Sequence, residues 1–532
     1  MTRTNRSLPI FLSLVFLAIF ASQTTAQETK TKWEVQSDHW YVIEIADVKA
    51  GWMNAQTLTD GERFKTITST KLSIGRGGVT IEITMESTFI ETGDGKPIEM
   101  TSRQNMSRMV IDQQWKFLDD KVLHVSRQGG RIITKQLSMP EGEWFTPLAA
   151  ERYIAEQIEA GKMEISYRML TSEQGIRPVG ITMTYVGDDL FDNEQISYTV
   201  TVWTTENDVL PIDGREMFTS EGLLVYSELD AQFGRMVTRL STETEAKAKD
   251  DQGEVPELMV STFIKPDKAI DRPHETKTAR IRLRAKKGKL PEIPSAGAQR
   301  VEDDPDSEGD SGGGGVILTI NIDDNLDAED GDAENDDFLE PSMIIDSSDP
   351  LVKKYARRYA RRAGKNVFDR AEALRKFVHK HISKKGLATA FASASETVRM
   401  RTGDCSEHGV LLAALLRADG IPARITTGLV YAESFGGEKD IFGWHMWTQA
   451  LIDGKWVDFD ATLPVRYSAA HVLTGTSSLA EGIGSTELSS LLVLLGNLEI
   501  EVLEVGYGND DNGHERDTPQ AQTQPDSHDN RE

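Results

Sequence analysis

The 532-residue chain has one cysteine, Cys405, and few positive charges relative to its negative ones. A single thiol excludes internal disulfides. The fold must therefore be stabilised by buried apolar side chains, which a chain of this length can supply in several domains. The sequence has 59 Lys and Arg against 85 Asp and Glu, for a net charge of −26. This negative surplus disfavours nucleic acid as a partner.

Apolar runs long enough to cross a membrane are missing after the N-terminal segment. Arg3 and Arg6 precede an apolar stretch at residues 8–21, and Thr24 to Ala26 supplies small residues for cleavage. The pattern is typical of a signal peptide at residues 1–26, and its apolar stretch is shorter than the ~20 residues that span a bilayer. We therefore expect a secreted or periplasmic mature protein with no integral membrane segment after signal cleavage.

The single cysteine lies at a predicted helix start. Polar residues surround it between Arg401 and His408, and the apolar run 410–416 follows. The first N–H groups of a helix are unpaired and the positive end of its dipole lies there, so a thiolate is favoured at this position. A lone cysteine is most often a small buried apolar residue, but its polar neighbours argue against that here. Cys405 is therefore the candidate nucleophile.

Two aromatic and β-branched stretches downstream supply a histidine and a carboxylate. His445 and Asp460 are 15 residues apart (460 − 445), and Asp453 and Gly454 between them are a strong two-residue turn signal. A hairpin would place imidazole and carboxylate side by side. With a helix start packed against the pair, Cys405 would attack, His445 would transfer the proton and Asp460 would fix the tautomer and ring orientation.

Two nearby side chains compete for these roles. Asp458 lies two residues before Asp460 and therefore on the same face of a regular strand, so the residue types alone do not separate the two carboxylates. His408 follows Cys405 by three positions, near the same helix face, where a packing role is favoured. The backbone N–H of Cys405 is available to bind an oxyanion, but the sequence names no side-chain donor for it.

At these motifs the chain resembles the bacterial transglutaminase-like superfamily, whose members combine a Gly-Asp-Cys helix start, a His-x-Trp strand and an Asp-x-Thr strand in this order. The stretch that resembles the family runs from about Ser342 to Pro464. Asp460, rather than Asp458, matches the Asp-x-Thr motif. Ala461 stands where many relatives carry proline, which changes backbone stiffness rather than the triad. The resemblance implies a papain-like α+β domain with acyl-enzyme chemistry on an amide.

The motifs and the resemblance together predict an exported cysteine hydrolase that cleaves peptide or isopeptide bonds in a protein or peptide substrate through a thioester on Cys405. Two alternatives stay open. An amine acceptor in place of water would make the protein a crosslinking transglutaminase, and a non-catalytic binding module could retain the fold. The triad supplies both nucleophile and proton transfer, so we expect no metal and no cofactor.

The chain divides into five predicted segments. Residues 27–291 show short alternating apolar runs between turn signals, which predicts an antiparallel β-meander, with one amphipathic helix near residues 147–160. We expect a curved sheet or half-barrel around this helix, with a scaffold, docking or substrate-capture role. The signal peptide at 1–26 precedes this meander, and a connecting segment at 292–341 follows it. Residues 342–506 are the predicted transglutaminase-like domain, and residues 507–532 are a predicted disordered polar tail.

The connecting segment, residues 292–341, is rich in Gly and Asp. Between Glu302 and Glu340 it has 16 Asp or Glu and no Lys or Arg. A calcium loop of the EF-hand type is excluded because Leu326 would occupy the first ligand position set by Gly331. We therefore predict a solvated linker, with one added strand at residues 316–322 and diffuse cation binding as a minor alternative.

Overall fold

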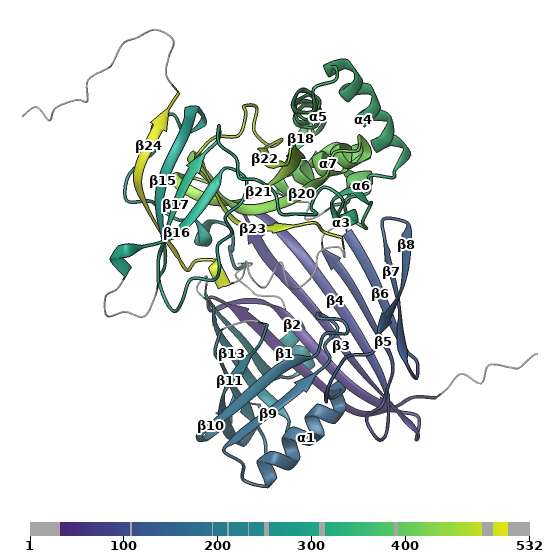
Figure 1. Ribbon diagram of the computed structural model, residues 1–532. Coiled ribbons are helices and arrows are strands. Elements are labelled where there is room, and N and C mark those ends of the chain that lie inside the picture. Colours follow the sequence, from purple (N-terminus) through teal and green to yellow (C-terminus); the bar gives the residue numbers. More distant parts are fainter. Residues whose placement is uncertain are drawn as a thin grey trace, which may run out of the picture.

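The computed structural model describes residues 32–106, 109–193, 195–209, 212–231, 234–248, 255–307, 314–387, 392–480 and 493–508. The predicted signal peptide at 1–26, and all but the first two residues of the predicted tail at 507–532, lie outside the described residues. Figure 1 shows the N-terminal strands in the lower half of the molecule and the later helices and smaller sheets above them.

The N-terminal part is one antiparallel sheet of 14 strands in the order β8-β7-β6-β5-β4-β3-β2-β1-β14-β13-β12-β11-β10-β9. Consecutive strands are neighbours in the sheet, except that β8 and β9 lie at its two ends; β1 and β14 meet in its middle. The strands are β1 (Glu34–Ile45), β2 (Val48–Thr59), β3 (Arg63–Arg76), β4 (Val79–Thr92), β5 (Pro97–Met106), β6 (Met109–Phe117), β7 (Lys121–Gln128), β8 (Arg131–Ser138), β9 (Glu164–Met169), β10 (Val179–Asp192), β11 (Ser197–Asn207), β12 (Gly214–Phe218), β13 (Leu224–Ala231) and β14 (Gly234–Ser241). The predicted meander is confirmed.

The predicted helix is also present, as α1 (Pro147–Glu159). It begins with proline, whose fixed φ suits the first helical position. Its Ile154 packs with Ile165, Met183 and Trp203 of the sheet, and the helix lies at the lower end of the curved strands in Figure 1. The short helices α2 (Glu243–Lys247), η1 (Val260–Thr262) and η2 (Pro273–Glu275) lead to the upper half.

Two hairpins of the large sheet meet the upper half of the molecule. The β3–β4 turn has Gly77 and Gly78 at φ 59° and 81°, and the β7–β8 turn has Gly129 and Gly130 at 56° and 80°. Positive φ at both central residues is the type I′ geometry that two-residue hairpins favour. Beside the second turn, Arg131 forms an ion pair with Asp346 at 2.6 Å. The sheet is thus joined to the C-terminal part through its turns.

A four-stranded sheet contradicts the linker interpretation for much of residues 292–341. Its order is β16-β17-β15-β24, from β15 (Thr276–Ala285), β16 (Gln299–Asp303), β17 (Val316–Asn321) and β24 (Leu498–Tyr507). Two short helices, η3 (Pro305–Ser307) and α3 (Asp336–Leu339), also fall in the segment. The added strand is confirmed as β17. This sheet also crosses the predicted boundaries, because β15 lies before residue 292 and β24 lies at residues 498–507, after the segment that supplies β16 and β17.

The physical reason lies in charges far apart in sequence. The buried Asp304 carboxylate forms ion pairs with Arg282 at 3.1 Å and with Arg284 at 2.7 Å, both from β15. A run of acidic residues without local cations can therefore fold when cations of another strand neutralise it. Apolar Leu318 and Ile320 of β17 are fully buried in the same sheet.

The C-terminal core places one buried helix between helices and a sheet. Helix α7 (Cys405–Ala418) has Leu411, Leu412 and Leu415 fully buried and packs on both sides. The helices on one side are α4 (Pro350–Ala363), α5 (Val367–His381) and α6 (Ala394–Met400). The sheet on the other side has the order β22-β21-β20-β23, from β20 (Ala423–Phe435), β21 (Glu438–Ile452), β22 (Lys455–Phe459) and β23 (His471–Ser477). The two-residue strands β18 (Lys384–Lys385) and β19 (Thr402–Gly403) pair with each other. The predicted α+β core is confirmed.

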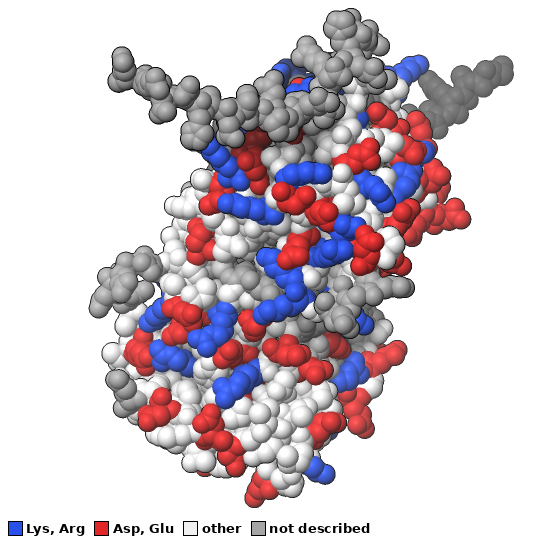
Figure 2. Space-filling model, turned by 90° about the vertical axis from the view of Figure 1, so that its left-hand side faces the viewer, with Lys and Arg blue, Asp and Glu red and all other residues white. Residues whose placement is uncertain are grey.

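Basic and acidic side chains are intermixed on the face shown in Figure 2, so neither sign dominates that face. Within the described residues, no helix combines the length and the apolar character that a membrane crossing requires.

Candidate active site

Helix α7 begins at Cys405 because the preceding residue caps it. The Asp404 carboxylate accepts a hydrogen bond from the Ser406 N–H at 2.8 Å, and the Glu407 carboxylate accepts one from the Asp404 N–H at 2.8 Å. This reciprocal capping box satisfies two N–H groups at the helix start. The cysteine is partly exposed. Cys405 therefore lies in the first turn of the helix, where the sequence predicts it.

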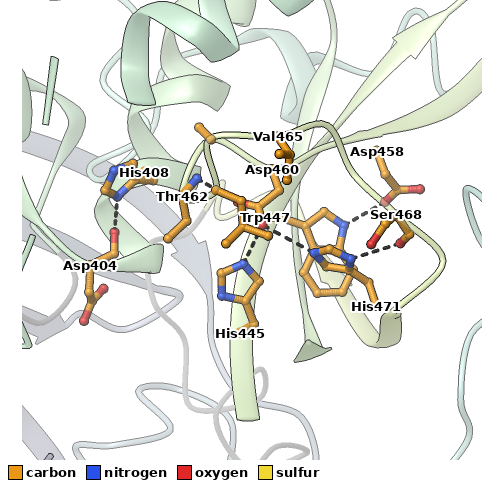
Figure 3. Close-up of polar contacts among 12 residues, drawn as sticks. Asp404, His408, His445, Trp447, Asp458, Asp460, Thr462, Val465, Ser468 and His471 are labelled. Carbon is orange, nitrogen blue, oxygen red and sulfur yellow. Dashed lines mark hydrogen bonds and ion pairs between the residues drawn. The ribbon is translucent and has the colours of Figure 1, made fainter. Parts of the chain in front are cut away.

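The hairpin predicted between His445 and Asp460 is formed by β21 and β22. Its turn is Asp453 and Gly454 at φ 51° and 78°, and Ile452 pairs with Lys455 across it. His445 projects from β21, and Asp460 follows the last residue of β22. The His445 Nε2 atom lies 2.9 Å from the Asp460 Oδ2 atom. Figure 3 marks this contact with a dashed line. The side chains are 7% and 0% exposed, so water does not weaken their interaction.

The same hydrogen bond determines which ring nitrogen is left for the thiol. With Nε2 bound to Asp460, Nδ1 of His445 is the remaining proton carrier. Burial lowers the pKa of His445, but the charge and hydrogen bond of Asp460, followed by a side-chain hydrogen bond and the charge of Cys405, outweigh it and raise the pKa to about 10. The structure thus brings the three side chains together. Their catalytic roles stay predictions.

The contact with His445 also shifts the pKa of Asp460. Burial raises it, but the His445 charge and hydrogen bond, with a further contribution from His471, hold it well below its usual range. The other Asp460 oxygen, Oδ1, accepts a hydrogen bond from the Thr462 N–H at 2.7 Å. The carboxylate is therefore ionised and held in one orientation.

The rival carboxylate Asp458 lies on the same face but contacts other residues. Its Oδ1 accepts hydrogen bonds from Trp447 Nε1 at 2.8 Å and Gln449 Nε2 at 2.9 Å. Because residues 445, 447 and 449 share one face of β21, Asp458 meets the later two and Asp460 meets His445. Position along the hairpin, which residue type does not reveal, separates the two aspartates.

His408 has a structural partner. Its ring is fully buried, and Nδ1 donates a hydrogen bond to the Asp404 carbonyl oxygen. Burial lowers the pKa of His408 to about 4, so the ring is neutral at pH 7. The hydrogen bond of this neutral ring stabilises the start of α7 beside Cys405.

A second histidine, which the sequence motifs do not predict, contacts the Asp460 carboxylate. His471 of β23 is fully buried, and its Nε2 lies 3.3 Å from Asp460 Oδ2. Its Nδ1 donates to the Ser468 carbonyl oxygen at 3.0 Å, and Tyr467 lies against the ring with centroids 4.4 Å apart. The pairing of β23 with β20 brings it there. The residues of 471–477, among them Val472, Leu473 and Thr474, are compatible with a strand but do not indicate its neighbour.

A buried arginine on α5 was also missed. The Arg375 guanidinium donates hydrogen bonds to the carbonyl oxygens of Asp460 at 3.1 Å, Leu463 at 3.1 Å and Val465 at 3.0 Å. Its charge is paired with Glu372 at 2.7 Å. Arg375 therefore fixes the loop that carries the triad aspartate.

Three side chains of the site have the composition of a metal site. Ligand atoms of His445, Asp460 and His471 lie within 4.8 Å of one another. Both imidazoles already point at the carboxylate oxygen at hydrogen-bond distance. Hydrogen bonding accounts for this arrangement.

Residues 353–461 match the family model of the transglutaminase-like superfamily. This part of the chain is a transglutaminase-like domain. The match contains Cys405, His445 and Asp460 and ends one residue after the aspartate. No curated protein sequence matches the chain.

One solved structure similar to the chain is a beta-barrel-like protein of a domain of unknown function, DUF1849, from Brucella abortus. The two are 13% identical, the similarity covers 38% of this chain and 95% of that chain, and the TM-score is 0.31. A "putative cysteine protease" from Cytophaga hutchinsonii is 19% identical, with 44% and 95% covered and a TM-score of 0.28. A "putative protease" from Parabacteroides distasonis is 10% identical, with 75% and 70% covered and a TM-score of 0.18.

Proposed function

We propose that the protein is an exported cysteine hydrolase that cleaves peptide or isopeptide bonds through a thioester on Cys405. The observation that carries the proposal is the buried hydrogen bond of 2.9 Å between His445 and Asp460, with the thiol at the start of α7 interacting with the same ring. A structural role for this trio gives no reason to bury an ionised carboxylate against a histidine that also meets a thiol.

The first half-reaction starts from the ion pair in which the thiol proton is already on Nδ1 of His445, and the Cys405 thiolate attacks the carbonyl carbon of the substrate amide. The carbonyl electron pair moves to oxygen, which the N–H groups at the start of α7 can stabilise. When this pair returns, the C–N bond breaks and His445 gives its proton to the leaving amine. Asp460 stabilises the imidazolium throughout. The product is an acyl-enzyme thioester.

In the second half-reaction water attacks the thioester carbonyl while His445 accepts a proton from it. The C–S bond then breaks, the acid is released, and the ion pair is restored. A primary amine could replace water and give a new amide bond. Protein crosslinking therefore remains the alternative activity, and a binding module that retains the fold is the alternative without catalysis.

The proposed location is the cell exterior or the periplasm. The signal-peptide pattern at residues 1–26 supports it.

One experiment distinguishes the hydrolase, the transglutaminase and the non-catalytic binding module. The chain from residue 27 onward is incubated with a peptide library and a labelled primary amine, and the products are identified by mass spectrometry. Hydrolysed peptides support the hydrolase, and amine-labelled peptides support the transglutaminase. The Cys405→Ala variant is the control and should lose all turnover with an unchanged fold. Full turnover by this variant, or none by the parent chain, would contradict the proposal.

A further inference from the structure

An ion pair joins the large N-terminal sheet to the residue before the thiol. Arg76 is the last residue of β3, and its guanidinium nitrogen lies 2.7 Å from the Oδ2 atom of Asp404. The Arg76 side chain is 27% exposed and the Asp404 side chain 6% exposed. Asp404 is the N-cap of α7 and the neighbour of Cys405. A residue 328 positions upstream (404 − 76) therefore contacts the start of the candidate nucleophile helix.

The hairpin that carries Arg76 is held in place on both sides. The Gly75 N–H donates a hydrogen bond to the Pro256 carbonyl oxygen at 2.7 Å. A Cβ atom on Gly77 would lie 2.7 Å from a Leu387 methyl carbon and 2.7 Å from the Met259 methyl carbon, so the turn packs closely against the segment that precedes α6. Arg76 thus projects from a rigid turn.

Two acidic side chains, Asp404 and Glu407, lie at the helix start that Arg76 reaches. Glu407 is fully buried, and burial, together with the Asp404 charge, raises its pKa to about 8. Its carboxylate accepts hydrogen bonds from the Ala392 and Asp404 N–H groups at 2.9 and 2.8 Å. Charged and titratable groups that act on this region from other elements are Arg76 of β3, His379 of α5, Lys385 of β18, His445 of β21 and Asp460 after β22.

A thiolate at Cys405 would lie next to the Asp404 charge, whereas Glu407, with a pKa of about 8, is mostly uncharged at pH 7. Nearby negative charge disfavours the thiolate, and a cation paired with that charge removes the penalty. Arg76 faces the Asp404 oxygen that does not cap the helix, while the other oxygen binds the Ser406 N–H. The guanidinium therefore both neutralises the cap and keeps it in its capping orientation.

We propose that Arg76 is a positioning residue for the Cys405 thiolate, so that the N-terminal sheet contributes a residue to the active site. This inference rests on the proposed function. It assigns the large sheet an electrostatic task at the helix start, in addition to any role in capturing substrate.

The test measures the rate of Cys405 alkylation by iodoacetamide against pH on the full chain. Cys405 is the only cysteine, so the reagent reports on this thiol alone. Arg76→Met should move the midpoint of the profile up by about 0.5 to 1 pH unit, which slows alkylation about three- to tenfold below the midpoint. Arg76→Lys should keep most of the parent profile, because it retains the charge.

Arg131→Met is the matched control. Arg131 also joins the sheet to the C-terminal part, at 2.6 Å from Asp346, and its side chain is 28% exposed, but its partner is not beside the thiol. This variant should leave the alkylation midpoint unchanged. An unchanged midpoint in Arg76→Met, or an equal shift in Arg131→Met, would overturn the inference.

A second pair of variants covers the case in which Arg76→Met does not fold. Asparagine is as good an N-cap as aspartate, so Asp404→Asn keeps the cap and removes the charge that Arg76 neutralises. In this background Arg76→Met should no longer shift the midpoint, and a shift as large as in the parent chain would refute the inference. These profiles do not depend on turnover. A chain without turnover that still shows the Arg76-dependent shift would contradict the proposed function alone.

Discussion

Replacing Asp460 by asparagine removes the charge that holds His445 protonated while retaining the size of the side chain. The structure sets the magnitude. The site raises the pKa of His445 from 6.5 to about 10, which corresponds to on the order of 5 kcal/mol in favour of the charged ring, mainly through Asp460. Without this charge, the thiolate–imidazolium pair loses its stabilisation and the ring its fixed orientation. We expect kcat at pH 7 to fall roughly 10³-fold or more.

Asp458→Asn is the matched control, because it makes the same chemical change on the same face of the same hairpin. Asp458 binds Trp447 and Gln449 rather than His445. We therefore expect kcat to stay near the parent value, while the free energy of unfolding drops by about 1–3 kcal/mol from impaired buried hydrogen bonds.

The assay is turnover of a peptide identified from the library, with urea unfolding measured on both variants. Substantial activity in Asp460→Asn together with an inactive, folded Asp458→Asn would show that the wrong carboxylate has been assigned. Equal losses in both would show that the hairpin, rather than one carboxylate, controls the rate.

Three further predictions concern the same region. His471→Gln should lower kcat by about 10- to 100-fold with little change in KM, because Asp460 loses a charge-assisted hydrogen bond, and an unchanged kcat would exclude a positioning role. The raised pKa of His445 means that its pair with Asp460 should stabilise the fold fully below pH 6.5 and progressively less as pH rises toward 10. The lowered pKa of Asp460 means that its contribution should be lost as pH falls below about 4. Equal urea midpoints at pH 7 and pH 10 would contradict the prediction for His445. Gly428→Ala should destabilise the protein by about 1–3 kcal/mol or prevent folding, because the new methyl group would lie 2.0 Å from the Val472 carbonyl oxygen, and a parent-like melting temperature would contradict that packing.

Local sequence signals predicted those features that depend on local structure. The alternating runs gave the meander, and the Asp453–Gly454 turn placed His445 beside Asp460, because two-residue turns fix the register of the strands they join. His471 could not be placed in this way. It reaches Asp460 only through the pairing of β23 with β20, and no short-range signal specifies which strand becomes the neighbour of another.

The linker prediction failed for a related reason. Charge counted along residues 302–340 omits cations from outside that window, and the cations that pair with Asp304 are Arg282 and Arg284. Arg76 is an extreme case, since nothing near it in sequence indicates that it would meet Asp404. Long-range electrostatic partners become visible only when the strands are placed in space.

The position of β1 in the middle of the large sheet affects how the protein is made. In the proposed exported chain, strands β1 to β8 can form as a row of consecutive hairpins as they emerge from the membrane, but the other side of β1 finds its partner only when β14, ending at Ser241, has followed. Until then β1 exposes an unpaired edge, which is a template for association with other chains. We expect newly synthesised chains to need a chaperone during this interval, and truncations shortly before residue 234 to aggregate.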